Sequence, residues 1–167
     1  MDMKYNNKLV CAAVFAIMLM ATGCKTPQKV SNVYATHTFK IECMGTDLDG
    51  SETVRAWGNG RNKAQALENA RKNAVKAVLF EGITGGMKGC NVRPVIGGVN
   101  AYERNETYFN RFFTDGGAYQ EYTSFADAKD HSNVKAADKN MEQWGAVIRV
   151  DRAGLRQRMI EDGIIKP

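Results

Sequence analysis

The most reactive side chains of this 167-residue sequence are its thiols and imidazoles: Cys11, Cys24, Cys43, Cys90, His37 and His131. Zinc sites place such ligands in closely spaced pairs. The cysteines here are far apart and no His-Glu-x-x-His motif occurs. We expect His37 to be a half-exposed strand residue and His131 to lie in a solvated loop. The sequence therefore predicts no metal and no cofactor.

Motifs for phosphate binding and acyl transfer are also missing. Gly58-Asn59-Gly60 precedes a predicted helix, but the third glycine of a dinucleotide fingerprint would fall at Lys63. No Gly-Lys-Ser/Thr and no Gly-x-Ser-x-Gly is present. We interpret the glycine pair as a structural turn and predict that the chain is not an enzyme. A hydrolase with two carboxylates stays open, because such pairs meet in space rather than in sequence.

The N-terminus has the pattern of an export signal. Lys4 and Lys8 precede an apolar run over residues 9–21. Its 13 residues are fewer than the roughly 20 that span a bilayer, but they suit a signal peptide. Cleavage elsewhere or a retained N-terminal helix are the alternatives. We assign residues 1–23 to a signal peptide and 24–32 to a tether.

The residues that end this run, Ala21-Thr22-Gly23-Cys24, resemble the lipobox of bacterial lipoproteins. In that family the cysteine thiol receives diacylglycerol, the chain is cut before the cysteine, and the new amine is acylated. The resemblance implies that Cys24 is the lipidation site and that its diacylglycerol and acyl chains bind the membrane. Lys25 follows where Asp retains lipoproteins in the inner membrane, so the resemblance favours the outer membrane, facing the periplasm.

Cys43 and Cys90 are then the two remaining thiols. Exported proteins occupy an oxidising compartment, where two cysteines can form a disulfide. The bond would close a loop of 47 residues and tie a glycine-rich segment to the first strand. Two separate thiols are the alternative.

Apolar periodicity predicts an α+β domain over residues 33–167. We expect strands at 33–42 and 52–58 around a turn at 45–51, then a helix that begins after Asn62 and ends at Gly82. A long glycine-rich loop covers 81–100 and a short aromatic helix covers 101–113. A strand at 119–125, a polar helix or loop at 126–140, a strand at 141–150 and a helix at 152–162 complete the domain. The expected sheet is mainly antiparallel with helices on one face, in the order β-β-α-(long loop)-α-β-β-α.

Aromatic and basic side chains supply a candidate interaction surface: Tyr102, Tyr108, Arg71, Lys72 and Lys76. The alternative is that the aromatic residues form the core and the basic residues a solvated helix face. The formal charge of +5 is spread along the chain, so nucleic acid is not an expected partner.

A second resemblance concerns the domain. Residues 56–60 (Ala-Trp-Gly-Asn-Gly), followed by Ala64, Ala66, Ala70 and Ala74, are similar to the N-terminal domain of flagellar assembly protein T and to related small envelope lipoproteins. This resemblance implies a lipid-anchored envelope protein that acts in assembly or protein interaction without catalysis. A small-ligand or glycan-binding lipoprotein is the alternative, and an envelope hydrolase is the less favoured one.

Overall fold

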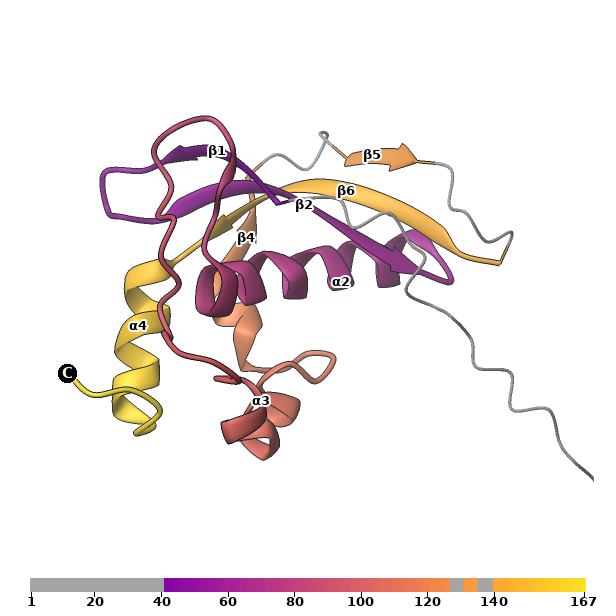
Figure 1. The fold of residues 1–167 in the computed structure, drawn as a ribbon. Coiled ribbons are helices and arrows are strands. Elements are labelled where there is room, and N and C mark those ends of the chain that lie inside the picture. The colour runs from indigo at the N-terminus through magenta and orange to yellow at the C-terminus, as the bar shows by residue number, and fades with distance from the viewer. Residues whose placement is uncertain (1–40, 127–130, 135–139) are drawn as a thin grey trace, which may run out of the picture. The chain divides into compact units, whose positions relative to one another are not determined.

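The computed structural model describes residues 41–126, 131–134 and 140–167, which belong to one unit, Thr36–Pro167 (Figure 1). The strands are β1 (Glu42–Thr46), β2 (Glu52–Gly60), β3 (Gly85–Gly86), β4 (Thr123–Phe125), β5 (His131–Val134) and β6 (Glu142–Val150). The α-helices are α2 (Lys63–Lys76), α3 (Glu106–Phe112) and α4 (Arg152–Glu161). A π-helical turn (Ala77–Glu81) and two 3₁₀ helices (Glu103–Asn105 and Ala118–Tyr122) complete the described elements. The predicted α+β class is confirmed.

The sheet has the order β3-β1-β2-β6-β4, and β5 also pairs with β6. All pairings are antiparallel except the short parallel pair of β1 with β3. β4 and β5 follow each other along the same edge of β6. The Ala126 N–H donates to the Val147 carbonyl, and His131 lies opposite Ala146, so four residues intervene where the sheet advances by one.

Helix α2 packs on β2 and β6 through small residues. Buried and half-buried residues alternate along β2, which places Glu52, Val54, Ala56, Gly58 and Gly60 toward the helix. A β-carbon on Gly58 would lie 2.1 Å from the Ala66 carbonyl oxygen. Gly58 and Gly60 therefore lie at the end of β2 and let α2 pack closely against it. They do not form the turn that we predicted from the sequence.

The ends of α2 follow the predicted signals. The Asn62 side chain accepts a hydrogen bond from the Gln65 N–H, as an N-cap does. Ala66, Ala70 and Ala74 form the fully buried stripe. The helix widens into the π-helical turn and stops at Gly82, whose φ of 76° suits glycine.

The other helices lie on the same side of the sheet as α2 (Figure 1). Phe109 and Phe112 of α3, with Leu155 and Met159 of α4, are buried in one core with the sheet. Asp151 caps α4 by accepting a hydrogen bond from the Gly154 N–H, and Gly163 ends it with a φ of 71°. Both signals agree with the predicted helix.

The position of the first strand is a correction. We expected a strand at 33–42 and a turn from Gly45, but β1 runs over Glu42–Thr46. Residues 33–40 lie outside the described part. The pattern misled because Cys43, whose side chain is buried, is followed by a bulge between Cys43 and Gly45 that breaks the alternation.

The segment before β6 also differs from its prediction. The expected strand at 119–125 begins as the 3₁₀ helix Ala118–Tyr122 and becomes β4 only at Thr123. The expected polar helix or loop at 126–140 contains β5. His131 is therefore a strand residue and not a solvated loop residue. Polar β5 forms because β6 offers a free edge, which a sequence window does not reveal.

Candidate functional site

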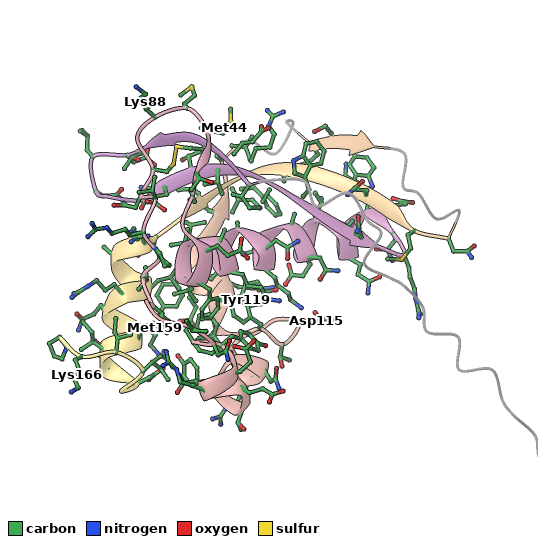
Figure 2. All side chains as sticks on the ribbon, in the orientation of Figure 1. Met44, Lys88, Asp115, Tyr119, Met159 and Lys166 are labelled. Carbon is green, nitrogen blue, oxygen red and sulfur yellow. A yellow bond between two sulfur atoms is a disulfide. The ribbon has the colours of Figure 1, made fainter. Side chains whose placement is uncertain are left out.

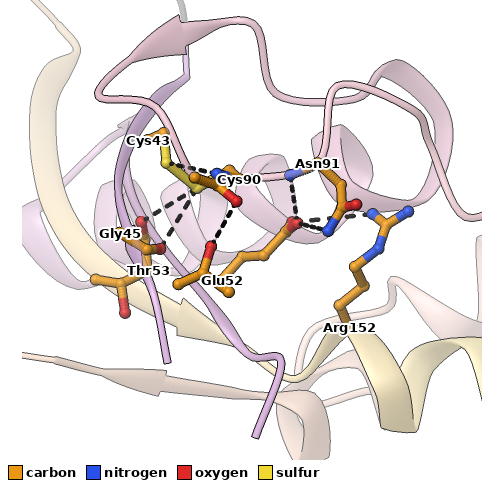
Figure 3. Close-up of a disulfide and its surroundings, with 9 residues drawn as sticks. Cys43, Gly45, Glu52, Thr53, Cys90, Asn91 and Arg152 are labelled. Carbon is orange, nitrogen blue, oxygen red and sulfur yellow. Dashed lines mark hydrogen bonds and ion pairs between the residues drawn. A yellow bond between two sulfur atoms is a disulfide. The ribbon is translucent and has the colours of Figure 1, made fainter. Parts of the chain in front are cut away.

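A disulfide fixes the long loop between the π-helical turn and α3. Cys43 of β1 is bonded to Cys90 at a Cα–Cα distance of 5.8 Å, across 47 residues (Figure 3). The Met87 N–H donates to the Cys43 carbonyl oxygen, and the Thr46 hydroxyl donates to the Gly89 carbonyl oxygen, each at 2.9 Å. The loop is thus clamped along β1.

The buried carboxylate of Glu52 holds the same loop through hydrogen bonds. Glu52 is fully buried, and its Oε1 accepts hydrogen bonds of 2.7 Å from both the backbone N–H and the Nδ2 of Asn91. Its Oε2 lies 3.9 Å from Arg152 Nη1 (Figure 3). Arg152 Nη2 donates to the Arg93 carbonyl at 2.8 Å. Glu52 therefore connects β2, the loop and the start of α4.

We predict that Glu52→Gln lowers the free energy of unfolding by about 1–3 kcal/mol, because the half-buried Arg152 charge loses its fully buried counter-charge while an amide oxygen remains for Asn91. Urea unfolding at neutral pH measures the change. The matched control is Glu42→Gln, an exposed residue of β1 that should leave stability within about 0.5 kcal/mol. Equal stability of both variants with the parent would contradict the role given to Glu52.

The predicted surface residues of α2 are engaged within the domain. Arg71 Nη2 donates to the Thr123 hydroxyl at 2.8 Å, and its guanidinium lies over the Phe125 ring. Lys72 pairs with Asp115. The Lys76 ammonium lies 5.3 Å from the Phe113 ring centre and 6.0 Å from that of Tyr102. Burial, and then the charge of Lys72, lower the pKa of Lys76. These contacts join α2 to the segment from Tyr102 to Phe125.

Glu68 completes this junction on α2. Its carboxylate accepts hydrogen bonds from the Tyr119 hydroxyl and the Gln120 amide, and it lies 3.5 Å from the Arg71 guanidinium. Burial alone raises the pKa of Glu68, but the bonds from Tyr119 and Gln120 outweigh it and hold the pKa below its usual value. Glu68 and Lys72 are four residues apart on α2, but Lys72 pairs with Asp115.

The aromatic residues mostly face one another. Phe80, Tyr102, Phe109, Phe112 and Phe113 make mutual ring contacts, and Phe109 is fully buried. The structure brings Tyr102 close to Lys76 but places Tyr108 at the far side of Phe109, toward α4. The five residues predicted as an interaction surface therefore do not form one surface. Arg71, Lys72, Lys76 and Tyr102 make contacts within the domain, and Tyr108 lies apart from them, toward α4.

Tyr108 borders an open pocket of about 600 Å³ between α3, the 3₁₀ helix Ala118–Tyr122 and α4. The pocket is lined by aromatic, charged and small residues: Tyr108, Arg111, Phe112, Gly117, Ala118, Arg158 and Asp162. Asp162 Oδ2 accepts hydrogen bonds from the Tyr108 hydroxyl at 2.5 Å and from Arg158 Nε at 2.6 Å. We term this site the Tyr108 pocket.

Charges in the Tyr108 pocket are unevenly matched. Hydrogen bonds from Arg158 and then Tyr108 lower the pKa of Asp162, so this carboxylate is ionised at neutral pH. Burial and the bond to Asp162 raise the pKa of Tyr108, which keeps its proton. Among the described residues, no hydrogen bond or ion pair engages the Arg111 side chain, although its charge also acts on Asp162. The pocket therefore carries one surplus positive charge.

Sequence reasoning missed Glu52, Arg111, Arg158 and Asp162. Glu52 had a signal, since it shares the strand face of Val54 and Ala56 and so had to be buried. Arg158 and Asp162 had one as well, because residues four apart in the last helical turn can pair. Arg111 had none, since Arg158 and Asp162, the charged residues that share the pocket with it, come from a distant segment.

The histidines show no metal chemistry in the part of the chain that the structure covers. No group of three or more His, Cys, Asp or Glu there could hold an ion. The His131 ring instead contacts Phe125 at 5.3 Å, and its Nε2 is buried without a hydrogen bond. His37 lies outside the described residues. That the chain needs no metal or cofactor stays a prediction.

The export and lipidation assignments, Cys24 included, concern residues outside the described ranges. None of the described helices has the length and apolarity to cross a membrane. No family model, curated protein or solved structure matches the chain. The resemblances to lipoproteins and to the flagellar assembly protein T domain therefore stay predictions.

Proposed function

We propose that this protein is a lipid-anchored envelope protein, held in the outer membrane through Cys24 and facing the periplasm, that binds a partner protein without catalysis. The Cys43–Cys90 disulfide supports export, because stable structural disulfides form in oxidising compartments. The apolar run and the lipobox-like residues before Cys24 support the anchor.

The observation that carries the binding role is the Arg111 guanidinium, which makes no hydrogen bond or ion pair with any described residue and lies beside Tyr108 and Phe112 in the Tyr108 pocket. A guanidinium binds a carboxylate with paired hydrogen bonds. Arg111 is exposed on α3, so an acidic side chain of a partner can reach it. We infer that the Tyr108 pocket receives an acidic segment of an envelope protein.

A small-ligand or glycan-binding role is the second candidate. The volume of about 600 Å³ lies within the range of about 300–1,000 Å³ that small-molecule sites occupy. Tyr108, Arg158 and Asp162 offer the aromatic and hydrogen-bonding groups that such ligands need. The two candidates differ in what the pocket holds.

The anchor is tested by Cys24→Ala. We expect the variant to leave the outer membrane fraction, because it carries no acyl chains. It then appears in the soluble envelope fraction, or in the inner membrane if the apolar run over residues 9–21 stays uncut. Fractionation of cells that express either form, followed by immunodetection, measures this. An unchanged distribution would overturn the anchor.

The pocket is tested by Arg111→Glu, with Arg156→Glu on α4 as the matched control outside the pocket. Cross-linking in intact envelopes and purification of the chain should recover a protein that Arg111→Glu loses about tenfold and Arg156→Glu retains. Equal recovery with both variants would contradict partner binding at this pocket. Native mass spectrometry showing a small bound molecule, lost in Arg111→Glu, would support the second candidate instead.

A further inference from the structure

One end of the sheet presents large apolar side chains that the Tyr108 pocket does not use. Leu48, in the turn between β1 and β2, is fully exposed, and Met87, just after β3, is 61% exposed. Lys88 is exposed beside Met87, and Met44 of β1 is half-buried (Figure 2). We term Met44, Leu48, Met87 and Lys88 the loop tip.

The loop tip is held in place by the fold. The Met87 N–H donates a hydrogen bond to the Cys43 carbonyl, and Cys90 is joined to Cys43 by the disulfide. The Thr46 hydroxyl, two residues before Leu48, is bonded to Gly89. A surface that is already ordered loses little conformational entropy when it binds, so exposed apolar groups on it suit an interaction site.

The loop tip also lies beside the start of the described chain. The described chain begins at Ile41, two residues before Cys43. Only 16 residues separate Ile41 from Cys24, and fully extended they reach at most about 55 Å. A lipid on Cys24 therefore leaves the loop tip within reach of the bilayer.

We propose that the loop tip contacts the phospholipid surface in which Cys24 is anchored; this inference rests on the proposed function. Leu48 and Met87 enter the boundary between the headgroups and the acyl chains, and Lys88 lies against lipid phosphates. Apolar side chains next to a cation are the combination that binds such an interface. The basic residues of α2 do not serve this role, because Arg71, Lys72 and Lys76 are engaged inside the domain.

This contact orients the domain. Figures 1 and 2 place Met44 and Lys88 on the side of the sheet away from α3, with α2 between them. When the loop tip faces the bilayer, the Tyr108 pocket on α3 and α4 faces away from it. The pocket is then presented to partners in the space beyond the membrane surface.

The test introduces tryptophan into the lipidated chain, reconstituted in vesicles of phosphatidylglycerol and brominated phosphatidylcholine. Met87→Trp places the probe at the loop tip. Val99→Trp is the matched control, since Val99 is 82% exposed on the same loop, close to α3. Bromine quenches tryptophan fluorescence only near the acyl region. The parent chain contains Trp57 and Trp144, so its quenching is subtracted from that of each variant. The remaining quenching should be about threefold greater for Met87→Trp than for Val99→Trp.

Equal quenching at the two positions would overturn the membrane contact while leaving the anchor intact. If Met87→Trp then cross-linked to a protein in intact envelopes, the loop tip would be a protein-binding surface instead. Failure of the anchor is recognised separately, because Cys24→Ala would then fractionate as the parent does. In that case the membrane contact, which depends on the anchor, falls with it.

Discussion

Removal of the disulfide by the double change Cys43→Ala/Cys90→Ala lowers the free energy of unfolding by about 4 kcal/mol, the chain-entropy value for a loop of 47 residues. The loss is a large share of the roughly 5–15 kcal/mol that stabilises a typical domain. Urea unfolding under non-reducing conditions measures it. Hydrogen exchange should rise most in residues 83–96, whose hydrogen bonds to β1, β2 and the π-helical turn depend on the closed loop.

Reductant supplies the control for this prediction. It should destabilise the parent chain and have no effect on the double variant, because the variant has no bond to reduce. Thiol counting under denaturing conditions gives the same answer chemically. Two free thiols at Cys43 and Cys90 in the oxidised parent would contradict the disulfide, and a parent unaffected by reductant would contradict its energetic role.

Substitution of one glycine under α2 has an expected effect of similar size. In Gly58→Ala the new β-carbon would lie 2.1 Å from the Ala66 carbonyl oxygen and 2.3 Å from the Ala70 nitrogen. Backbone atoms cannot rotate away, so α2 must move off β2. We expect a loss of about 3 kcal/mol, the upper part of the range for overpacked cores. Displacement would also strain the hydrogen bonds from Asn69 and Asn73 to the β2 backbone.

Gly97→Ala is the matched control, because its β-carbon meets no atom within 4 Å and its backbone needs no left-handed conformation. It should change stability by no more than about 0.5 kcal/mol. Thermal unfolding of both variants, followed by circular dichroism, makes the comparison. Equal melting temperatures would mean that α2 does not sit on Gly58 as closely as described.

The sequence was most informative where local signals decide the structure. Asn62 caps α2 as predicted, and Asp151 and Gly163 bound α4 close to the predicted helix at 152–162, all through contacts within a few residues. The strand predicted at 141–150 is also present as β6, with Ala146, Ile148 and Val150 buried. Such features depend on periodicity and capping, which a single sequence displays.

Features that depend on distant pairing were not predictable in this way. β5 is polar and forms a strand only because β6 lies beside it. The Tyr108 pocket joins Arg111 to Arg158 and Asp162, which a sequence window does not connect. Lys72 pairs with Asp115, 43 residues away, rather than with the neighbouring Glu68, because the fold brings the turn that contains Asp115 to the Lys72 ammonium. Side-chain partners across elements are set by topology, which local patterns do not contain.

Along the edge of β6, more residues separate β4 from β5 in sequence than in the register of the sheet. The Ala126 N–H donates to Val147, and His131 lies opposite the next residue, Ala146, although four residues lie between Ala126 and His131 in sequence. We therefore expect an insertion between Ala126 and His131 to leave the described strand pairs in register. This position suits an inserted epitope or fluorophore, so the protein can be located in the envelope with both its termini and its disulfide unaltered.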